Sequence, residues 1–538
     1  MSNDNGQNEE STVSSSSQKQ GNYFNHNQKL STDGNLPSSE TTKVQVTPEK
    51  FLLRGKQRLE RGDYRGAAED FNQALRLDPN YVDAYHHRGQ IRYFVGDYSG
   101  AIKDYSLAIR INPKFAQSYF HRAYARSALG DYSEALKDLH LAISINPQFA
   151  EAYIHKCYIL NQLGDYQGVK ENYRQVLQFN PKDAETYIAR GTARAALEDK
   201  EGAIKDFTQA LSLEPKNINA YISRGLTRDE LGDYHGAIKD YNHALNINPK
   251  SAKIYTNRGL ARAAMGDTQG AIEDYSRSLL INHYFAAAYV NRGIVRNTTG
   301  DKQGAIEDYN KALQINPNFA AAYINRGVTR AAMGDNQGAI EDYNQALKIN
   351  PHFAEAYNNR GLARAALQDY FGAIEAYDRT LQINPNLAAA YNNRAIAAAA
   401  IGDYPGAIDN LTQVLRINPQ DACAYFNRGL FRSSFNHRQA IEDYTQALHI
   451  KPHYAEAYFQ RGKTRYNLGD TQGAIEDFNQ AIKINPNYAE AYGNRGIALS
   501  ANGNKIGAIE DLQKAANLYL DQGNMEKYQK ALELIKKI

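Results

Sequence analysis

The chain has 538 residues and a formal net charge of only +3, from 62 basic and 59 acidic side chains. This near-balance argues against a nucleic-acid-binding protein, which normally carries a strong basic excess. With only two Cys and no run of about 20 apolar residues, the sequence predicts neither a disulfide framework nor membrane insertion, and it favours a cytoplasmic location. The N-terminal residues also lack the pattern of a secretory signal.

Residues 1–46 are rich in Ser, Asn, Gln and Thr and contain few large apolar side chains. Such a segment cannot offset the entropy lost on folding, so we expect a disordered tail. Thr47 and Pro48 follow, and Pro in the first turn suits the start of a helix.

From position 51 onward a large aromatic residue recurs every 34 residues, and we call it the anchor of each unit. The anchors are Phe51, Tyr85, Tyr119, Tyr153, Tyr187, Tyr221, Tyr255, Tyr289, Tyr323, Tyr357, Tyr391, Tyr425, Tyr458 and Tyr492, with one 33-residue step before Tyr458. A fixed period of this size indicates stacked helical units. We therefore predict an all-α protein with a solenoid of 14 repeats over residues 47–520.

Each unit reads as two helices joined by a turn. In the unit anchored at Tyr323, the first helix is expected over residues 320–333 and the second over residues 336–349. Asp335 is a suitable N-cap for the second helix, and Pro351 ends it because Pro cannot continue a helix. In one unit His283 replaces this Pro, which predicts a tighter or more helical joint there.

The spacing of small, aromatic and Pro residues is similar to that of the tetratricopeptide repeat. In this unit it is carried by Gly327, Ala339, Tyr343, Ala346 and Pro351, and the resemblance covers about residues 48–520. The resemblance implies a right-handed α-solenoid superhelix whose first helices line a concave groove. It also implies a binding scaffold for proteins or peptides, with no enzymatic activity, cofactor or metal.

One position departs from the family pattern. Three residues after the anchor the chain has Arg, or Lys156 in one unit, where an apolar residue is usual. A second Arg follows one turn later in most units, and an Asp precedes the aromatic of the second helix, as with Arg326, Arg330 and Asp342. We expect Arg–Asp pairs between the two helices. The alternative is that the Arg side chains extend to solvent.

Two residues after the anchor, most C-terminal units carry an amide on the face expected to line the groove. These residues are Asn257, Asn291, Asn325, Asn359, Asn393, Asn427, Gln460 and Asn494. An amide both donates and accepts, so it can pair with a peptide backbone of any sequence. The row resembles the asparagine ladder of the O-linked N-acetylglucosamine transferases, which holds extended polypeptide. Alternatively, these amides bond to neighbouring first helices and only rigidify the stack.

The early units instead place His at this position, beside several aromatic side chains. The residues are His87, His121, His155, Phe94, Phe120 and Tyr124. They suit either a contact surface for a partner or packing between repeats. A metal site is not expected, because helices about 8–10 Å apart do not bring these rings within about 2 Å of one ion.

At the C-terminus, residues 521–538 carry an apolar stripe with helical spacing, which predicts a helix that caps the last repeat. The sequence as a whole predicts a monomeric, non-enzymatic adaptor or assembly factor that holds extended protein segments in its groove. The main alternative is a substrate-recognition partner of a separate enzyme such as a glycosyltransferase. RNA binding is disfavoured by the 34-residue period and the neutral groove, and a self-assembling solenoid is a further rival.

Overall fold

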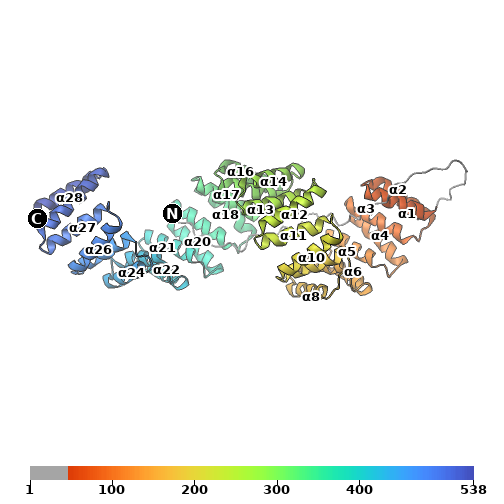
Figure 1. Cartoon of the computed structure of the whole chain (residues 1–538), viewed down its shortest axis with the longest axis horizontal. Helices are drawn as coiled ribbons and strands as arrows, with labels where there is room; N and C mark the ends of the chain where they lie inside the picture. The colour runs from red at the N-terminus through yellow and green to blue at the C-terminus, as the bar shows by residue number, and fades with distance from the viewer. Residues whose placement is uncertain (1–46) are drawn as a thin grey trace. The chain divides into compact units, whose positions relative to one another are not determined.

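The computed structural model describes residues 47–538, so the expected disorder of residues 1–46 lies outside the described residues. From residue 47 onward the chain is helical (Figure 1), with 29 α-helices and no strand. The helices divide into two compact units, with the boundary between Val295 and Arg296 inside α15 (Ala286–Thr298). The prediction of an all-α solenoid built from helix pairs is confirmed.

Unit 1 holds seven complete helix pairs and the start of α15. Its helices are α1 (Pro48–Glu60), α2 (Tyr64–Leu77), α3 (Val82–Phe94), α4 (Tyr98–Ile111), α5 (Ala116–Ala128), α6 (Tyr132–Ile145), α7 (Ala150–Gln162), α8 (Tyr166–Leu177), α9 (Ala184–Ala196), α10 (Lys200–Leu213), α11 (Ile218–Glu230), α12 (Tyr234–Ile247), α13 (Ala252–Ala264) and α14 (Thr268–Ile281). As expected, Pro48 occupies the first turn of α1.

Unit 2 continues the same alternation to the C-terminus. Its helices are α16 (Lys302–Ile315), α17 (Ala320–Ala332), α18 (Asn336–Ile349), α19 (Ala354–Ala366), α20 (Tyr370–Ile383), α21 (Ala388–Ala400), α22 (Tyr404–Ile417), α23 (Ala422–Arg432), α24 (His437–Ile450), α25 (Ala455–Asn467), α26 (Thr471–Ile484), α27 (Ala489–Ala501), α28 (Lys505–Asp521) and α29 (Met525–Lys537). The 33-residue step corresponds to α23, which is shorter than the other first helices.

The turn inside most hairpins is set by a Gly and an Asp. Gly334 has a φ of +89°, a conformation that Gly adopts without a steric penalty. The next residue, Asp335, accepts a hydrogen bond from the Gly338 N–H at 2.8 Å, so it caps α18 as the sequence predicts.

The joint at His283 does not differ from the others. Asn282 has φ −136° and ψ 92°, close to the −132° and 93° of Asn316, which precedes a Pro. The prediction of a tighter or more helical joint is therefore wrong, because the extended Asn and the turn after it form without the Pro ring.

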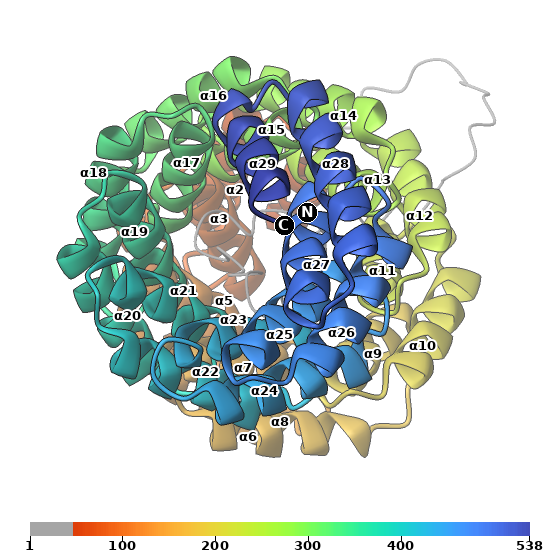
Figure 2. The same ribbon diagram turned by 90° about the vertical axis from the view of Figure 1, so that its left-hand side faces the viewer.

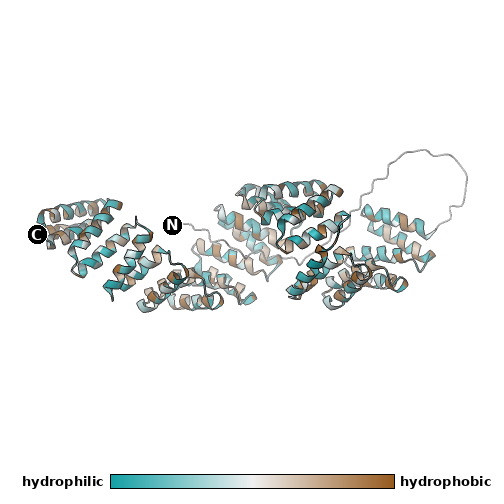
Figure 3. Ribbon diagram, turned by 60° about the horizontal axis from the view of Figure 1, so that its bottom comes forward, coloured by the Kyte–Doolittle hydropathy of each residue, from teal (hydrophilic) through white to brown (hydrophobic). Residues whose placement is uncertain are grey.

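Within most hairpins a Gly of the first helix lies directly against an aromatic ring of the second. A Cβ atom at Gly327 would lie 2.7 Å from Cε1 of Tyr343, a fully buried side chain. Ala339 and Ala346 are also buried and keep the backbones close. Each helix carries both hydrophobic and hydrophilic segments (Figure 3), as expected of helices that bury one face.

Along each unit, helices pack mainly on the helices before and after them in sequence, and successive first helices such as α7 and α9 also touch. At the C-terminal end α27, α28 and α29 lie side by side (Figure 2). Tyr528 of α29 packs against a buried cluster that includes Ala489, Ala515 and Tyr519. Because every neighbour is local, the position of each first helix is fixed by adjacent repeats.

Candidate functional site

Ion pairs between the two helices of most hairpins hold the first helices in place. The Arg258 guanidinium donates through Nε to Oδ2 of Asp274 at 2.8 Å and through Nη2 to Oδ1 at 2.6 Å, while Arg262 approaches the same carboxylate at 3.1 Å. Asp274 is buried, so the expected Arg–Asp pair is confirmed. Equivalent pairs join Arg54–Asp70, Arg88–Asp104, Arg122–Asp138, Arg190–Asp206, Arg224–Asp240, Arg326–Asp342, Arg428–Asp443, Arg461–Asp477 and Arg495–Asp511.

The same Arg residues also link most hairpins to the one before, which the sequence analysis missed. Arg224 donates through Nη1 to Thr208 Oγ1 at 2.9 Å, and Arg461 donates to Thr445 Oγ1 at 3.0 Å. In most repeats the acceptor lies 16 residues before the Arg, where the sequence has Asn, Ser, Thr or Asp, and that pattern could have revealed it. Arg190 instead donates to the Phe179 carbonyl. The links fix the spacing between successive first helices and therefore between the residues of the Asn row.

Most amides of the predicted row are half-buried on the first helices. In unit 1 Asn291 on α15 is half-buried, whereas Asn257 on α13 is buried, with only 9% exposed. In unit 2 the half-buried amides are Asn325, Asn359, Asn393, Asn427, Gln460 and Asn494, on α17, α19, α21, α23, α25 and α27. The Nδ2 atom of Asn257 is buried without a partner among the described residues.

Few of these amides form hydrogen bonds within the described chain. Asn325 and Asn494 donate through Nδ2 to the backbone carbonyls of Ala321 and Glu490, four residues earlier, at 2.8 Å in both cases. Such a bond orients the side chain and leaves its Oδ1 as an acceptor. Of the row, only Asn393 reaches a neighbouring first helix among the described residues, donating to Asn358 Oδ1 at 3.3 Å.

Exposed aliphatic side chains lie beside four Asn residues of the row in unit 2, three residues after each of them. Their exposed fractions range from 37% for Val328 to 55% for Ile396. The four residues are Val328, Leu362, Ile396 and Leu430. The residue directly after the anchor Tyr323, Ile324, is instead buried against the next repeat.

The His residues of the early units lie mostly inside the stack. His121 and His155 are buried, and His87 is half-buried. His87 Nδ1 lies 2.7 Å from Gln90 Oε1, and Gln90 Nε2 lies 2.9 Å from His121 Nε2. His121 also stacks on His86, with ring centroids 4.9 Å apart, closer than the helix spacing suggested.

Burial determines the charge state of these rings. Burial lowers the pKa of His87 to about 4, although its hydrogen bond with Gln90 acts in the opposite direction. Burial, together with the neighbouring His87 and His155, lowers the pKa of His121 to about 3. The pKa of His155 is lowered to about 3, again mainly by burial. The rings are thus neutral near pH 7. Within residues 47–538 no cluster of His, Cys, Asp or Glu side chains is arranged to hold a metal ion.

The aromatic residues predicted beside these His rings do gather around them. Tyr124 stacks on His155 with centroids 3.8 Å apart, and Phe120 contacts His121 at 5.2 Å. Phe120 is buried and Tyr124 is half-buried, whereas Phe94 is exposed and stacks on Tyr64. Of this set, Phe94 and Tyr124 therefore remain accessible to a partner.

The two Cys residues show no paired or activated state. Cys157 is buried, and burial raises the pKa of its thiol to about 12, so it acts as a packing residue. Cys423 is free and exposed. Along residues 47–538, none of the helices has the length and apolar character needed to cross a membrane.

Comparison with known families identifies the repeat. The model described as TPR repeat matches residues 55–94, 230–266, 296–334, 329–368, 436–469 and 462–503. Two models described as tetratricopeptide repeat match residues 82–115, 116–149, 150–183, 184–217 and 354–387. Together these matches cover more than half of the chain. No curated protein matches the sequence significantly.

Solved structures with helical repeats are also similar. The APC/C hetero-tetramer Cut9–Hcn1 has 16% identity and a TM-score of 0.40, and the match covers 84% of this chain and 96% of that one. MamA has 27% identity and a TM-score of 0.29, with 31% and 96% covered. YrrB, described as a TPR protein with an unusual peptide-binding site, has 21% identity and a TM-score of 0.32, with 35% and 96% covered.

Proposed function

We propose that this chain, which belongs to the tetratricopeptide repeat family, binds an extended segment of a partner protein through the Asn side chains of its first helices. The repeats support a role as a protein-interaction scaffold. We assign the chain the finer role of a monomeric, cytoplasmic adaptor or assembly factor without enzymatic activity. The likeness to the groove of the O-linked N-acetylglucosamine transferases rests on the Asn row alone.

The observation that carries the proposal is the free hydrogen-bonding capacity of the row in unit 2. The amides of Asn359 and Asn427 make no hydrogen bond to other residues of the described chain, and Asn325 offers its Oδ1. Half-buried amides fixed on helices can pair with backbone N–H and C=O groups at little entropic cost. Because only Asn393 bonds to a neighbouring first helix, the purely structural role is less well supported.

The spacing of the row also suits a peptide backbone. Packed helices lie about 8–10 Å apart, and an extended peptide rises about 3.3 Å per residue, so one Asn meets about every third peptide residue. The aliphatic residues beside the row, such as Leu362 and Ile396, offer contact area to apolar side chains of the partner. We therefore expect a preference for segments with recurring apolar residues and a tolerance of their exact identity.

The test compares two quadruple variants in binding to a library of extended peptides, measured by fluorescence anisotropy. The first replaces Asn325, Asn359, Asn393 and Asn427 with Ala. The matched control replaces Gln314, Gln345, Gln446 and Gln480, four exposed amides on second helices of unit 2, with Ala. We expect the first variant to lose at least tenfold in affinity and the control to keep it. Equal affinities for the wild type and the Asn variant would refute the proposal.

A second candidate function is recognition of substrates for a separate enzyme, favoured by the resemblance of the Asn row to the transferase ladder. In that case the peptides that bind would also be modified by the enzyme, and the Asn variant would lower the modification rate in proportion to binding. An adaptor would instead retain the bound segment unmodified. Mass spectrometry of a captured segment distinguishes the two functions.

A further inference from the structure

One unit breaks the charge balance of the Arg–Asp pairs. The hairpin of α19 and α20 keeps both Arg360 and Arg364, but Ala376 replaces the Asp. Two other units also lack the Asp, with Asn172 or Asn410 in its place, and both have lost the second Arg as well. Only the α19–α20 hairpin therefore combines two guanidinium groups with no carboxylate or amide at this position.

Arg360 is left without its usual partner. Its Nη1 donates to Asn344 Oδ1 at 2.9 Å, as in the other repeats, but its Nε is buried and has no hydrogen-bond partner among the described residues. The neighbouring Arg364 donates to the Gly372 carbonyl at 3.0 Å and lies 3.7 Å from Glu375, an exposed residue. Burial, and then repulsion from Arg364, lowers the pKa of Arg360.

The hairpin does not close around the smaller Ala376 side chain. A Cβ at Gly361 would lie 2.5 Å from Cε1 of Tyr377, the same distance as at Gly55 and Phe71, where Asp70 is present. The separation of the helices is therefore that of a hairpin with its Asp. Ala differs from Asp only by the carboxylate beyond Cβ, so the Nε edge of Arg360 faces the position where other repeats hold a carboxylate.

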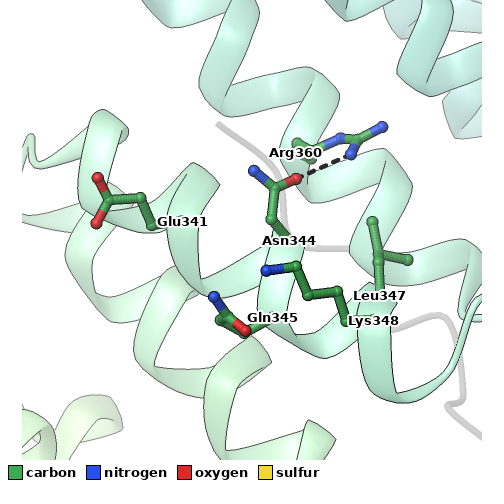
Figure 4. Close-up of a pocket in the computed structure, with 6 residues that line it drawn as sticks. All are labelled: Glu341, Asn344, Gln345, Leu347, Lys348 and Arg360. Atoms are coloured by element: carbon green, nitrogen blue, oxygen red, sulfur yellow. Dashed lines mark hydrogen bonds between the residues drawn. The ribbon is translucent and has the colours of Figure 1, made fainter.

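Solvent reaches the guanidinium group from its Nη1 side, where it bonds to Asn344, whereas Ala376 is fully buried. Arg360 lines an open pocket of about 530 Å³ on α18 and α19 (Figure 4). Asn344 and Lys348 line it beside Arg360, and Glu341 contributes the one acidic side chain. With Lys348 and Arg360 both cationic, the pocket favours an anion on its Arg360 side.

We propose that Arg360 binds a carboxylate group supplied from outside the chain, held where the other repeats place their Asp. The bonding expected is that of Arg258 and Asp274, in which Nε and Nη2 donate to the two oxygens at 2.8 and 2.6 Å. Paired N–H donors of Arg match a carboxylate, and such charge-assisted bonds are stronger than neutral ones. The ligand is thus a small organic acid or an acidic side chain of a partner.

The test uses hydrogen exchange of the full chain in sodium formate and in sodium chloride at equal ionic strength. Formate should slow exchange in α19 and α20 but not in α17 and α18, where Asp342 already occupies the equivalent position. Ala376→Asp should slow exchange without formate and abolish the formate effect. Arg360→Gln should abolish the effect even if Ala376→Asp fails to fold.

The source of the carboxylate follows from a second probe, N-acetylaspartate methylamide. Slower exchange with this probe as well as with formate indicates a site open to the acidic side chain of a partner. An effect of formate alone indicates a small free acid. The proposal is overturned if formate and chloride act alike, or if the formate effect persists in Arg360→Gln.

Discussion

At the residue scale, the arrangement of the helices depends on Arg guanidinium groups that each donate hydrogen bonds to two different residues. Arg258 bonds to Asp274 in its own hairpin and to Asn242 in the hairpin before it. A buried carboxylate contacted by two Arg residues costs solvation energy, and the bidentate geometry offsets that cost. The Arg side chains therefore hold the two helices of a hairpin together and also set the spacing between successive hairpins.

Replacing one of these carboxylates should destabilise its hairpin. Asp342→Asn leaves Arg326 and Arg330 without their shared anion, so we expect the local free energy of unfolding to fall by about 2 kcal/mol. Hydrogen exchange of α17 and α18 measures this loss. Glu341→Gln, at the adjacent exposed position, is the control and should leave exchange unchanged. Equal exchange in the two variants would contradict this role of the pair.

The buried His residues predict a pH dependence confined to the early helices. The pKa of His87 is about 4 and that of His121 about 3, both below the ordinary His value of about 6.5. As the pH falls below about 6.5, the unfolded chain takes up protons before the folded chain, so folding stability falls. Helices α3 to α5 should thus lose protection between pH 6.5 and 5.

The control for this measurement is the region α25–α28, whose helices contain no His. Helix α7, which carries His155, is not used in the comparison. Burial and the neighbouring Glu185 raise the pKa of Glu151 in α7 to about 8, so protonation of this group stabilises the folded chain as the pH falls, opposite to the effect of the His residues. Exchange rates are corrected for the intrinsic effect of pH. Identical pH dependence in α3–α5 and α25–α28 would show that the His cluster carries no such linkage.

At the element scale, most hairpins depend on a close approach between a Gly and an aromatic ring. Gly327→Ala would place Cβ 2.7 Å from the Tyr343 ring, and such overpacking costs about 1–3 kcal/mol. Gly493→Ala in α27 is a matched control, because its Cβ would meet only Ala515 at 3.9 Å. We expect that control to stabilise the helix by about 0.5–1 kcal/mol. Thermal unfolding of the two variants should therefore shift in opposite directions.

The hairpins themselves were predictable because the 34-residue period, the N-cap residues and the Pro residues that end the second helices all recur. Asp335 and Pro351 mark helix ends by local chemistry alone, and the recurrence of Arg326 after the anchor and of Asp342 before the second-helix aromatic pointed to their pairing. Features that depend on side-chain direction were not predictable. The rings of His86 and His121 stack with centroids 4.9 Å apart, closer than the spacing of the helices suggested.

At the scale of the whole molecule, stability should spread only between neighbouring repeats. We propose that α29 caps unit 2, since Tyr528 covers a cluster with Ala489 and Tyr519. Removing residues 522–538 should speed hydrogen exchange in α27 and α28 and leave α19 and α20 unchanged. Lys527→Ala, which keeps Tyr528 and removes an ion pair with Glu490 and a cation–π contact with Tyr519, should have a much smaller effect. Uniform acceleration across unit 2 would contradict this local coupling.

The most direct measurement of the central claim is the affinity of one selected peptide before and after methylation of its backbone nitrogens. Each methyl group removes a backbone N–H that would donate a hydrogen bond to Asn325, Asn359 or Asn427, while the side chains of the peptide stay the same. The account predicts at least a tenfold loss of affinity for the wild type, and little further loss for the variant with four Asn→Ala changes. Unchanged affinity of the methylated peptide for the wild type would contradict backbone recognition by the Asn row.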